Sequence, residues 1–512
     1  MFENTLAVEI LLQINQFHSN KIKDRNENAI LGLDMEKAFD RVEHEYMFEI
    51  IHKMKLGPNI TNRIRTLYTG IHQQVETPWG YTDKIKVQRG IRQGCALSMA
   101  LFTITLEPFL QKIKKTIEGI DCNGTNYKTL AYADDTVIFL HDETDKQRLE
   151  HILKVYEKAS GAKINNDKSQ ELKLAHITSV VKEKPIEILG IKFTTNSMNR
   201  TNINWKENIE KIKNTLTKFK QRDITILGKA TIINTYVISQ IIHLSRIIPP
   251  LKKHIKEINS SISNFLGMDK PKNYTYANMH RHPTKGGFGL PHVETKVNAT
   301  VAMWMQYYSN KTEQNLWTDN FKELLKTKPQ PNQNIIHHNL LAIKNKDRFN
   351  WNKVTMKQVY EDLLKPITKP FQIENILQRT MDWDKTWTDW THYNVNNKLK
   401  IEAHKILGDN APKITNRSGN CCTCDLPHIL SRDHSYLTCT GLTRLQKYIH
   451  DTYDLEIDNR IFFNKYNSIE DVKVTYTYIY TITTLAQTQK GKWGKINETA
   501  LINTFQHYIT HQ

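Results

Sequence analysis

Acidic side chains stand at two separated points of this 512-residue chain where the local pattern changes. Asp34 lies near the end of the apolar stretch 29–35, and Asp134 and Asp135 lie in the expected turn of AYADDT. Adjacent Asp residues in a turn are most often only solvated turn residues. Carboxylates from neighbouring strands, however, are ligands that Mg²⁺ prefers, and two such ions about 3.5–4 Å apart can clamp the oxygens of phosphoryl transfer. Because a bound cation would relieve their repulsion, the three acids together predict a two-metal site.

The elements that position these acids follow from local patterns. Residues 29–35 form a short apolar run, which is typical of a buried strand. Turn and cap residues mark the other elements. In chain order we expect a helix over 40–55, a helix over 99–117 with Ser98 as its N-cap and a bend at Pro108, a hairpin at Asn123-Gly124, a hairpin of 128–131 with 136–140, a helix over 149–160, and a strand pair over 186–193 broken at Gly190.

The charge of the chain is uneven. The net charge is +18, nearly all of it in residues 201–512 and more than half in 201–300. An apolar stripe at helical spacing, with lysines largely off it, begins at Trp205 and runs through Ile209, Ile212, Leu216 and Phe219. On one isolated helix such lysines indicate only a solvated face. A concentrated basic excess instead favours a contact surface for nucleic acid.

Composition excludes several classes of protein. Hydrophobic residues make up 39% and charged residues 24%, which is typical of a globular chain. No run of 18 apolar residues occurs, so we expect no membrane span. The first ten residues carry two Glu and no basic cluster, which argues against a secretory signal.

Four of the six cysteines lie between residues 421 and 439, which indicates metal binding in a reducing compartment. Cys421, Cys424, His434 and Cys439 give four soft or borderline ligands within a short segment, which suits structural Zn²⁺. Cys422 could replace Cys421, although its spacing to Cys424 is less usual, and free thiols in a loop are the simpler alternative.

The ordered set of motifs resembles the reverse transcriptase of non-LTR (LINE-type) retrotransposons. Three palm motifs of that family are similar to LDMEKAFD (33–40), RGIRQGCALSMALF (89–102) and AYADDT (131–136). Further motifs follow in the family's order: GAKINNDKS (161–169), the primer-grip turn EILGIKF (187–193), RDITILGKATIIN (222–234), KGGFGL (285–290), MDWDKTW (381–387) and the Cys/His cluster. Together they cover nearly the whole chain.

The resemblance implies a role for each matching residue. Asp34 and Asp134 would be the principal Mg²⁺ ligands, with Asp135 alongside. Lys163 or Lys168 would be the general acid for the pyrophosphate leaving group, and the sequence does not choose between them. The remaining roles are a steric gate against the ribose 2′-OH at Phe39, contacts to the nucleotide or template base at Gln93, Gly94 and Tyr132, and a primer grip at Leu189 and Gly190.

The resemblance also implies a fold and a domain order. We expect an α+β protein with a right-hand polymerase palm, a small antiparallel sheet with helices. The expected segments are the palm with a remnant of the fingers (1–200), a helical thumb (201–308), a helical connector (309–412), a zinc knuckle (413–445) and a C-terminal segment (446–512). Only 33 residues precede Asp34, so the resemblance predicts a chain without most of the fingers and without the family's endonuclease domain.

The expected function is RNA-directed DNA synthesis from a primer on an RNA template, with two Mg²⁺ ions, deoxynucleoside triphosphates and a structural Zn²⁺. The alternative is a catalytically impaired relic that retains nucleic-acid binding, since the fingers supply triphosphate contacts. A group II intron maturase shares the palm but matches KGGFGL and the Cys/His cluster less well. Priming on genomic DNA would place the protein in the nucleus, with the cytoplasm as the other possibility. The sequence leaves the oligomeric state open.

Overall fold

The computed structural model describes most of the first 310 residues and several later segments. Its described residues are 8, 12, 28–122, 124–174, 184–267, 279–282, 287–309, 319, 320, 322, 349–367, 420–424, 434–457, 468–489 and 495–511. The motif MDWDKTW, the start of KGGFGL and most of the expected connector lie outside this part of the chain.

The chain divides into two compact units, which are described separately. The first comprises Met1–Glu207, Leu244–Leu251 and Val301–Lys353, and the second comprises Asn208–His243, Lys252–Thr300 and Val354–Gln512. This division follows packing within the chain and leaves the five expected functional segments as predictions.

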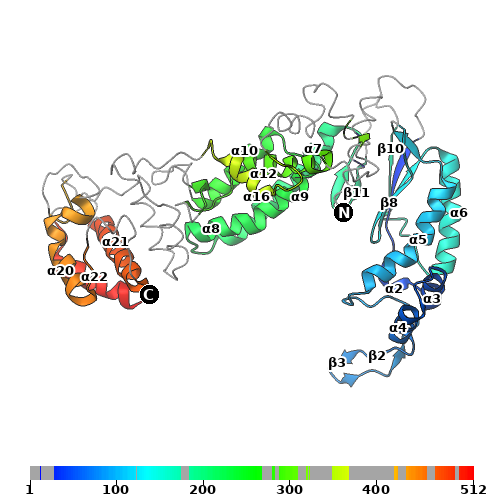
Figure 1. Ribbon diagram of the computed structural model, residues 1–512, viewed down its shortest axis with the longest axis horizontal. Coiled ribbons are helices and arrows are strands. Elements are labelled where there is room, and N and C mark those ends of the chain that lie inside the picture. Colours follow the sequence, from blue (N-terminus) through cyan, green and yellow to red (C-terminus); the bar gives the residue numbers. More distant parts are fainter. Residues whose placement is uncertain are drawn as a thin grey trace. The chain divides into compact units, whose positions relative to one another are not determined.

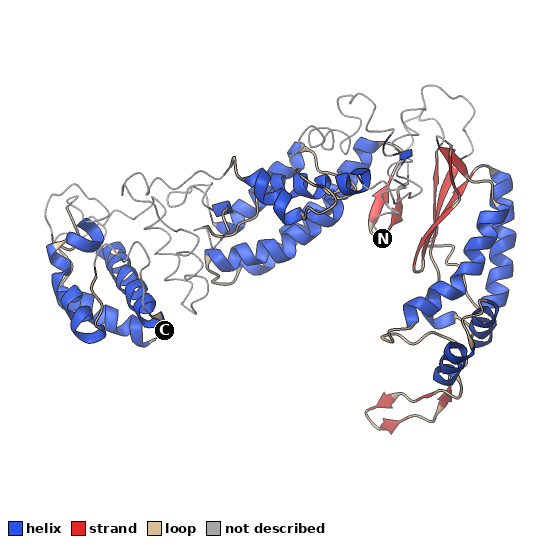
Figure 2. Ribbon diagram, in the orientation of Figure 1, coloured by secondary structure: helices blue, strands red, loops and turns tan. Residues whose placement is uncertain are grey.

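A four-stranded antiparallel sheet forms the centre of the first unit, with strand order β10-β1-β9-β8 (Figures 1 and 2). Its strands are β1 (Ala29–Leu33), β8 (Thr129–Tyr132), β9 (Asp135–Leu140) and β10 (Gln170–Lys173). Strand β1 lies between two partners, which explains its nearly continuous apolar sequence. The expected strand at 29–35 and the hairpin around the acids are confirmed.

Helices cover one face of this sheet. The core between them includes Ile138 and Leu140 of β9 and Leu33 of β1. Since side chains alternate along a strand, residues of the other parity face away from these helices. The helices of this region are α2 (Ala38–Arg41), α3 (His44–Lys53), α4 (Pro58–Tyr68), α5 (Ser98–Thr116) and α6 (Glu143–Ser160).

Three expectations about these helices were wrong in detail. Leu97, not Ser98, is the N-cap of α5, because the Ser98 hydroxyl donates to the Arg92 carbonyl instead of capping the helix. The expected helix 40–55 is two helices, α2 and α3, separated by extended residues at Val42 and Glu43. Helix α6 also begins earlier than residue 149, since Asp142 caps it and accepts from the Asp145 backbone N–H.

Short hairpins complete the strands. The expected hairpin is confirmed by the pairing of β6 (Ile120–Cys122) with β7 (Thr125–Tyr127), and Asn123 of its turn lies outside the described residues. The expected break at Gly190 separates β11 (Ile186–Ile188) from β12 (Ile191–Phe193). Between α4 and α5 the chain forms a ribbon of β2 (His72–Gln73), β3 (Glu76–Thr77), β4 (Gly80–Tyr81) and β5 (Ile85–Lys86).

Helices dominate the rest of the chain. The long helix α7 (Ser197–Lys220) buries Trp205, Ile209, Ile212 and Leu216, as the stripe predicts, and leaves most of its lysines exposed. The following helices are α8 (Ile226–Ile232), the π-helical turn η1 (Ile233–Val237), α9 (Ile238–Ser245), α10 (Lys252–Leu266), α12 (Val293–Ala302), α13 (Trp304–Ser309) and α16 (Met356–Leu364).

The C-terminal residues pack around a core of their own, which includes Cys421, Cys422 and Cys439. Its elements are η3 (His434–Thr438), η4 (Thr440–Leu442), α20 (Thr443–Tyr453), α21 (Ile469–Gln489) and α22 (Glu498–Thr510). Throughout the described part of the chain, none of the helices combines the length and the apolar character needed to cross a bilayer.

Candidate active site

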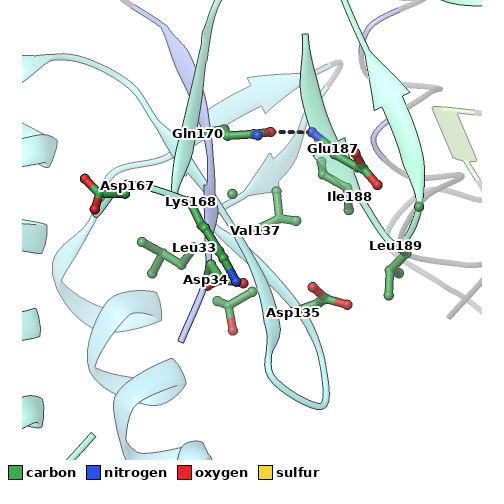
Figure 3. A pocket seen from close by; sticks show the side chains of 13 residues that line it. Leu33, Asp34, Asp135, Val137, Asp167, Lys168, Gln170, Glu187, Ile188 and Leu189 are labelled. Atoms are coloured by element: carbon green, nitrogen blue, oxygen red, sulfur yellow. Dashed lines mark hydrogen bonds between the residues drawn. The ribbon is translucent and has the colours of Figure 1, made fainter. Parts of the chain in front are cut away.

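One cavity of about 440 Å³ opens on the sheet face that the helices leave uncovered (Figure 3). Asp34 has the same parity as Gly32 of β1, and Asp135 has the same parity as Val137 of β9, so both acids project to this face. The side chains that line the cavity are otherwise contributed by Leu33, Thr136, Asp167, Lys168, Gln170, Glu187, Ile188 and Leu189. The fold therefore brings together residues more than 150 positions apart.

The turn between β8 and β9 decides which acids enter this cavity. Tyr132 pairs with Asp135, so Ala133 and Asp134 alone form the turn, and Ala133 adopts a φ of 55°. Asp134 is exposed on this turn and does not line the cavity. Tyr132 is also exposed and does not line it. Asp34 with Asp135, rather than Asp34 with Asp134, is thus the pair that lines the cavity.

The three acids influence one another electrostatically. The pKa of Asp135 is raised, first because its surroundings displace water and then because the charges of Asp134 and Asp34 lie nearby. Within the described residues, however, these acids do not form a group compact enough to share one ion as they stand. Oxygen ligands in an open, negatively polarised cavity fit hard cations such as Mg²⁺.

Only one of the two candidate lysines lines the cavity. The Lys163 ammonium lies 3.1 Å from Glu36 and holds the pKa of that carboxyl below its usual range. Lys168 lines the cavity with Asp34, and Figure 3 draws its ammonium directed toward that acid. The Asp34 backbone N–H donates to the Ser169 hydroxyl at 3.2 Å, which holds the Lys168 loop against the end of β1.

The turn of the β11–β12 hairpin forms another wall of the cavity. Leu189 and Gly190 lie there with φ angles of 51° and 76°, which the two central residues of a tight hairpin turn adopt. The Glu187 backbone N–H donates to the Gln170 side chain at 2.7 Å and ties this hairpin to β10 (Figure 3). The primer-grip candidates therefore lie opposite the acids.

Phe39, Gln93 and Gly94 lie close to the acids in the chain but outside the lining of this cavity. Phe39 stacks on Phe102 with ring centroids 4.5 Å apart and remains partly exposed. Gln93 donates to the Asp40 carboxylate at 3.3 Å, so it is held beside the helix that carries Phe39. Gly94 is exposed, with a φ of 83°, and a Cβ at this position would meet no atom within 4 Å.

Two acids that line the cavity were not singled out from the sequence. Asp167 lies beside Lys168 in the motif GAKINNDKS, and Glu187 opens the motif EILGIKF. Each motif was noted for a Lys or a Gly. They could have been found from their position, because each lies at or near the end of a strand, as the three acids do.

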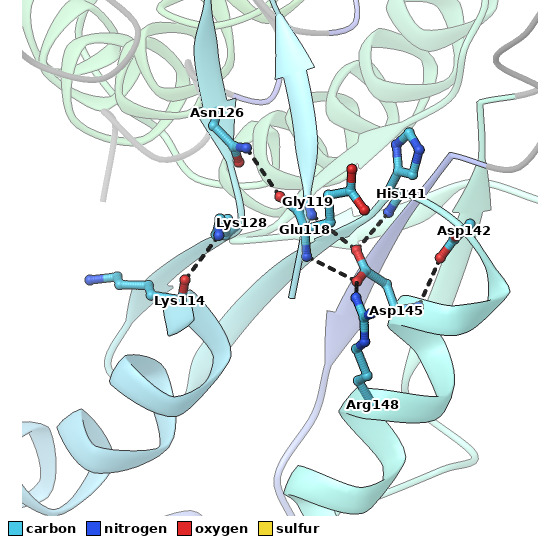
Figure 4. A network of polar contacts seen from close by, with 9 residues as sticks. All are labelled: Lys114, Glu118, Gly119, Asn126, Lys128, His141, Asp142, Asp145 and Arg148. Carbon is cyan, nitrogen blue, oxygen red and sulfur yellow. Dashed lines mark hydrogen bonds and ion pairs between the residues drawn. The ribbon is translucent and has the colours of Figure 1, made fainter. Parts of the chain in front are cut away.

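A buried carboxylate holds the far end of β9 (Figure 4). Asp145 is fully buried and accepts from the backbone N–H groups of Glu118, Gly119 and His141 at 2.9–3.1 Å. Arg148 contributes a fourth contact at 3.2 Å. These donors outweigh the cost of burial and lower the pKa of Asp145. This clamp fixes β9 relative to α6 and to the segment after α5.

The C-terminal cysteines and histidine form a second candidate metal site. The ligand atoms of Cys421, Cys424, His434 and Cys439 all lie within 4.8 Å of one another. Cys422 is not in this group, and its carbonyl accepts from the Ile496 backbone N–H. Of the two alternatives that the sequence left open, the geometry favours Cys421.

The distances in this group fit a tetrahedral zinc site. The sulfurs of Cys421 and Cys439 are 3.7 Å apart, and the Cys424 sulfur lies 3.5 Å from His434 Nε2. Zn–S bonds of about 2.3 Å and Zn–N bonds of about 2.0–2.1 Å place such atoms about 3.8 Å and 3.6 Å apart. The hydrogen bond between these two thiols lowers the pKa of Cys421 and raises the pKa of Cys439.

Comparison with known proteins shows which families this region resembles. Residues 4–193 match the family model "Reverse transcriptase (RNA-dependent DNA polymerase)". That range contains the four-stranded sheet, the acids, Lys168 and both hairpins of the cavity. The part of the chain that builds the cavity is therefore similar to reverse transcriptases.

The chain is also similar to proteins of transposons and retrotransposable elements. The transposon TX1 149 kDa protein of Xenopus laevis is 28% identical over 66% of this chain and 26% of its own length. R2 retrotransposon Pol polyproteins of Popillia japonica and Drosophila melanogaster are each 22% identical, over 40% and 56% of this chain and 38% and 28% of their own. The chain thus spans well under half the length of these relatives. A telomerase structure from Candida albicans is 11% identical over 63% of this chain and 53% of its own, with a TM-score of 0.30, which is too low to support a shared fold.

Proposed function

We propose that this protein is an RNA-directed DNA polymerase that extends a DNA primer on an RNA template. The observation that carries the proposal is the cavity in which Asp34, Asp135 and Lys168 face the β11–β12 turn, within a region that is similar to reverse transcriptases. Carboxylates and an ammonium in one open cavity suit nucleotidyl transfer, in which negative charge develops on phosphate oxygens.

Asp34 and Asp135 hold the metal ions in this proposal, with Asp134 alongside. Mg²⁺ held by these carboxylates would supply positive charge for the negative charge that develops during nucleotidyl transfer. The raised pKa of Asp135 supports this role, because burial and the nearby charges of Asp134 and Asp34 disfavour its carboxylate form and a bound cation would favour it. Asp167 and Glu187 add further negative charge around the same cavity.

Lys168 is the general acid in this proposal, because it lines the cavity whereas Lys163 is paired with Glu36. It would give its proton to the pyrophosphate leaving group. Leu189 and Gly190 support the primer end, and Gln93 and Gly94 contact the nucleotide or template base, with Tyr132 on the neighbouring hairpin. Phe39 acts as the steric gate, which requires its ring to remain partly exposed as observed.

The later segments complete the proposal. Residues 201–308 act as the thumb, whose exposed lysines contact phosphates without reading sequence. The connector is proposed over 309–412, and Cys421, Cys424, His434 and Cys439 hold a structural zinc in a knuckle that binds RNA. Deoxynucleoside triphosphates and a primed RNA template are the substrates. The nucleus, or otherwise the cytoplasm, stays a prediction of location.

Primer extension tests the polymerase. The full chain is incubated with poly(rA)–oligo(dT), thymidine triphosphate and Mg²⁺, beside Asp34→Asn and the matched variant Asp142→Asn. We expect incorporation by the wild type and by Asp142→Asn, and loss of about 10³-fold in Asp34→Asn. Equal incorporation by Asp34→Asn would contradict the metal assignment. No incorporation by any form, with salt-sensitive RNA binding retained, would favour the nucleic-acid-binding relic.

Zinc content tests the C-terminal site separately. We expect about one zinc per chain by elemental analysis of the wild type and of Cys95→Ser, a free cysteine outside the group. Cys439→Ser should lose the metal, and melting of the C-terminal part should shift to lower temperature, because structural zinc contributes folding free energy. Equal zinc in Cys439→Ser would contradict the ligand set.

A further inference from the structure

A β-ribbon arm, residues 70–89, projects from the first unit between α4 and α5 (Figure 1). Residues facing each other across it are His72 with Lys86 and Glu76 with Tyr81. The turn at its tip is fixed locally, because the Thr77 hydroxyl accepts from the Trp79 backbone N–H and donates to the Gly80 carbonyl. The arm is therefore a formed element whose tip presents the Trp79 ring.

The rings at this tip are unusually exposed. Trp79 is 91% exposed and Tyr81 is 69% exposed. Of the large hydrophobic side chains that the described residues expose, half lie on the arm or on α4 at its base: Ile60, Leu67, Val75, Trp79, Tyr81 and Ile85. Single exposed apolar residues are ordinary, but a Trp held at the end of a ribbon is costly to solvate and indicates a contact.

Cations follow these rings along the returning strand. Lys84, Lys86 and Arg89 are exposed, and Arg92 follows them, so basic residues outnumber the acids Glu76 and Asp83 on this stretch. None of the three arm cations forms an ion pair within the described residues. Charged residues are depleted from the cores of protein–protein interfaces, so this mixture of rings and cations favours a polyanion.

The arm is continuous with the candidate active site. Strand β5 ends at Lys86, and the chain reaches Gln93 seven residues later. Gly90 between them has a φ of 93°, and a Cβ there would lie 3.0 Å from the Asp40 carbonyl oxygen. The base of the arm is thus packed tightly against the helix that carries Phe39, which couples its placement to that of the site.

We propose that this arm binds the unpaired RNA strand, with Trp79 stacked on a base and Lys84 and Lys86 contacting phosphates. The proposal rests on the proposed function, since it takes the strand to be the template. Bases of a duplex are stacked inside it, whereas an unpaired base has a free face for an exposed ring. Arg89 continues the basic path toward Arg92 and Gln93.

Equilibrium binding of two probes tests this inference on the full chain. The probes are fluorescein-labelled single-stranded (rA)20 and the hybrid (rA)20–(dT)20, measured at fixed salt. We expect Trp79→Ala to weaken single-strand binding by about tenfold, within the range of one lost stacked base, and hybrid binding by less than about twofold. Trp79→Phe should retain most of the affinity. Val155→Ala, an exposed apolar residue on α6, is the matched control.

Cross-linking locates the contact independently of affinity. Single-stranded RNA that contains 4-thiouridine should cross-link to the peptide that carries Trp79 in the wild type, and not in Trp79→Ala. Unchanged affinity together with no cross-link in 70–89 would overturn the inference and leave a protein contact as the use of the arm. Equal losses on both probes would also overturn it. Because neither assay needs DNA synthesis, failure of the polymerase proposal would be seen separately in primer extension.

Discussion

The two ends of strand β9 carry aspartates in opposite electrostatic situations. At its start, Asp135 faces an open cavity beside two other acids, and its pKa is raised. Just beyond its end, Asp145 is buried among four donors, and its pKa is lowered. The protein satisfies the charge of Asp145 itself and leaves that of Asp135 for a ligand from solution. A structural carboxylate can thus be told from a ligand-binding one by whether protein donors or a ligand from solution stabilise its charge.

Neutralising Asp135 at the start of β9 should give the largest effect, and this effect should be on activity and not on stability. Asp135→Asn should lower primer extension by about 10³-fold. The free energy of unfolding of this variant at neutral pH should not fall. Because the pKa of Asp135 is raised, its contribution to stability is present below its unfolded pKa and is lost as pH rises through its folded pKa. Activity and thermal unfolding are measured on the same samples, with Asp142→Asn alongside.

A clear loss of stability in Asp135→Asn would break the comparison, because the acid would then be held by the fold rather than by a ligand. If Asp135→Asn retained DNA synthesis, the proposed role of Asp135 in metal binding would be contradicted. Asp142→Asn should change neither quantity, since Asn and Asp cap helices about equally well.

Neutralising Asp145 should give the next effect, on stability alone. Asp145→Asn should cost about 2–4 kcal/mol, because charge-assisted hydrogen bonds to backbone N–H groups are lost. The lowered pKa means that this stability is present above the unfolded pKa of about 3.9 and is lost as pH falls through the folded pKa. The difference in the free energy of unfolding between wild type and variant should therefore disappear at acidic pH.

Hydrogen exchange localises this second effect. The amides of Gly119 and His141, which donate to Asp145, should exchange faster in the variant at neutral pH. If their protection were unchanged, the clamp would not be what holds the end of β9.

Adding Mg²⁺ should give the smallest effect and should sharpen the contrast. At tenfold excess over its dissociation constant, an ion that binds only the folded protein stabilises it by about 1.4 kcal/mol. We expect this increment in the wild type and in Asp145→Asn, and a smaller one in Asp135→Asn. Thermal unfolding with and without Mg²⁺ measures it. An increment that depended on Asp145 instead would reverse the assignment of the two aspartates.

Local patterns predicted much of the region around β9. The apolar run of β1, the hairpin around the acids and the α7 stripe are each visible within a few residues, and the spacing of Cys421, Cys424, His434 and Cys439 predicted a group that the structure brings together. These features depend on the periodicity of apolar residues or on the types of ligand residue, and both can be read from a short segment of sequence.

Features that depend on distant partners were not predicted. The sequence could not choose between the lysines, because Lys163 is engaged by Glu36 through the pairing of Met35 with Ile164. The clamp by Asp145 joins three segments of the chain, and Ser98 left its expected capping role for the Arg92 carbonyl. Tertiary hydrogen bonds decided each case.

The two-residue turn at Ala133 and Asp134 has a genetic consequence. Because residues of β9 alternate between the helix core and the cavity, inserting or deleting one codon within this hairpin would exchange the two faces. Ile138 and Leu140 would turn toward solvent, and Asp135 would turn toward the core. Copies of this sequence could accumulate many substitutions along β9 and keep the site, whereas a single in-frame length change there would inactivate it.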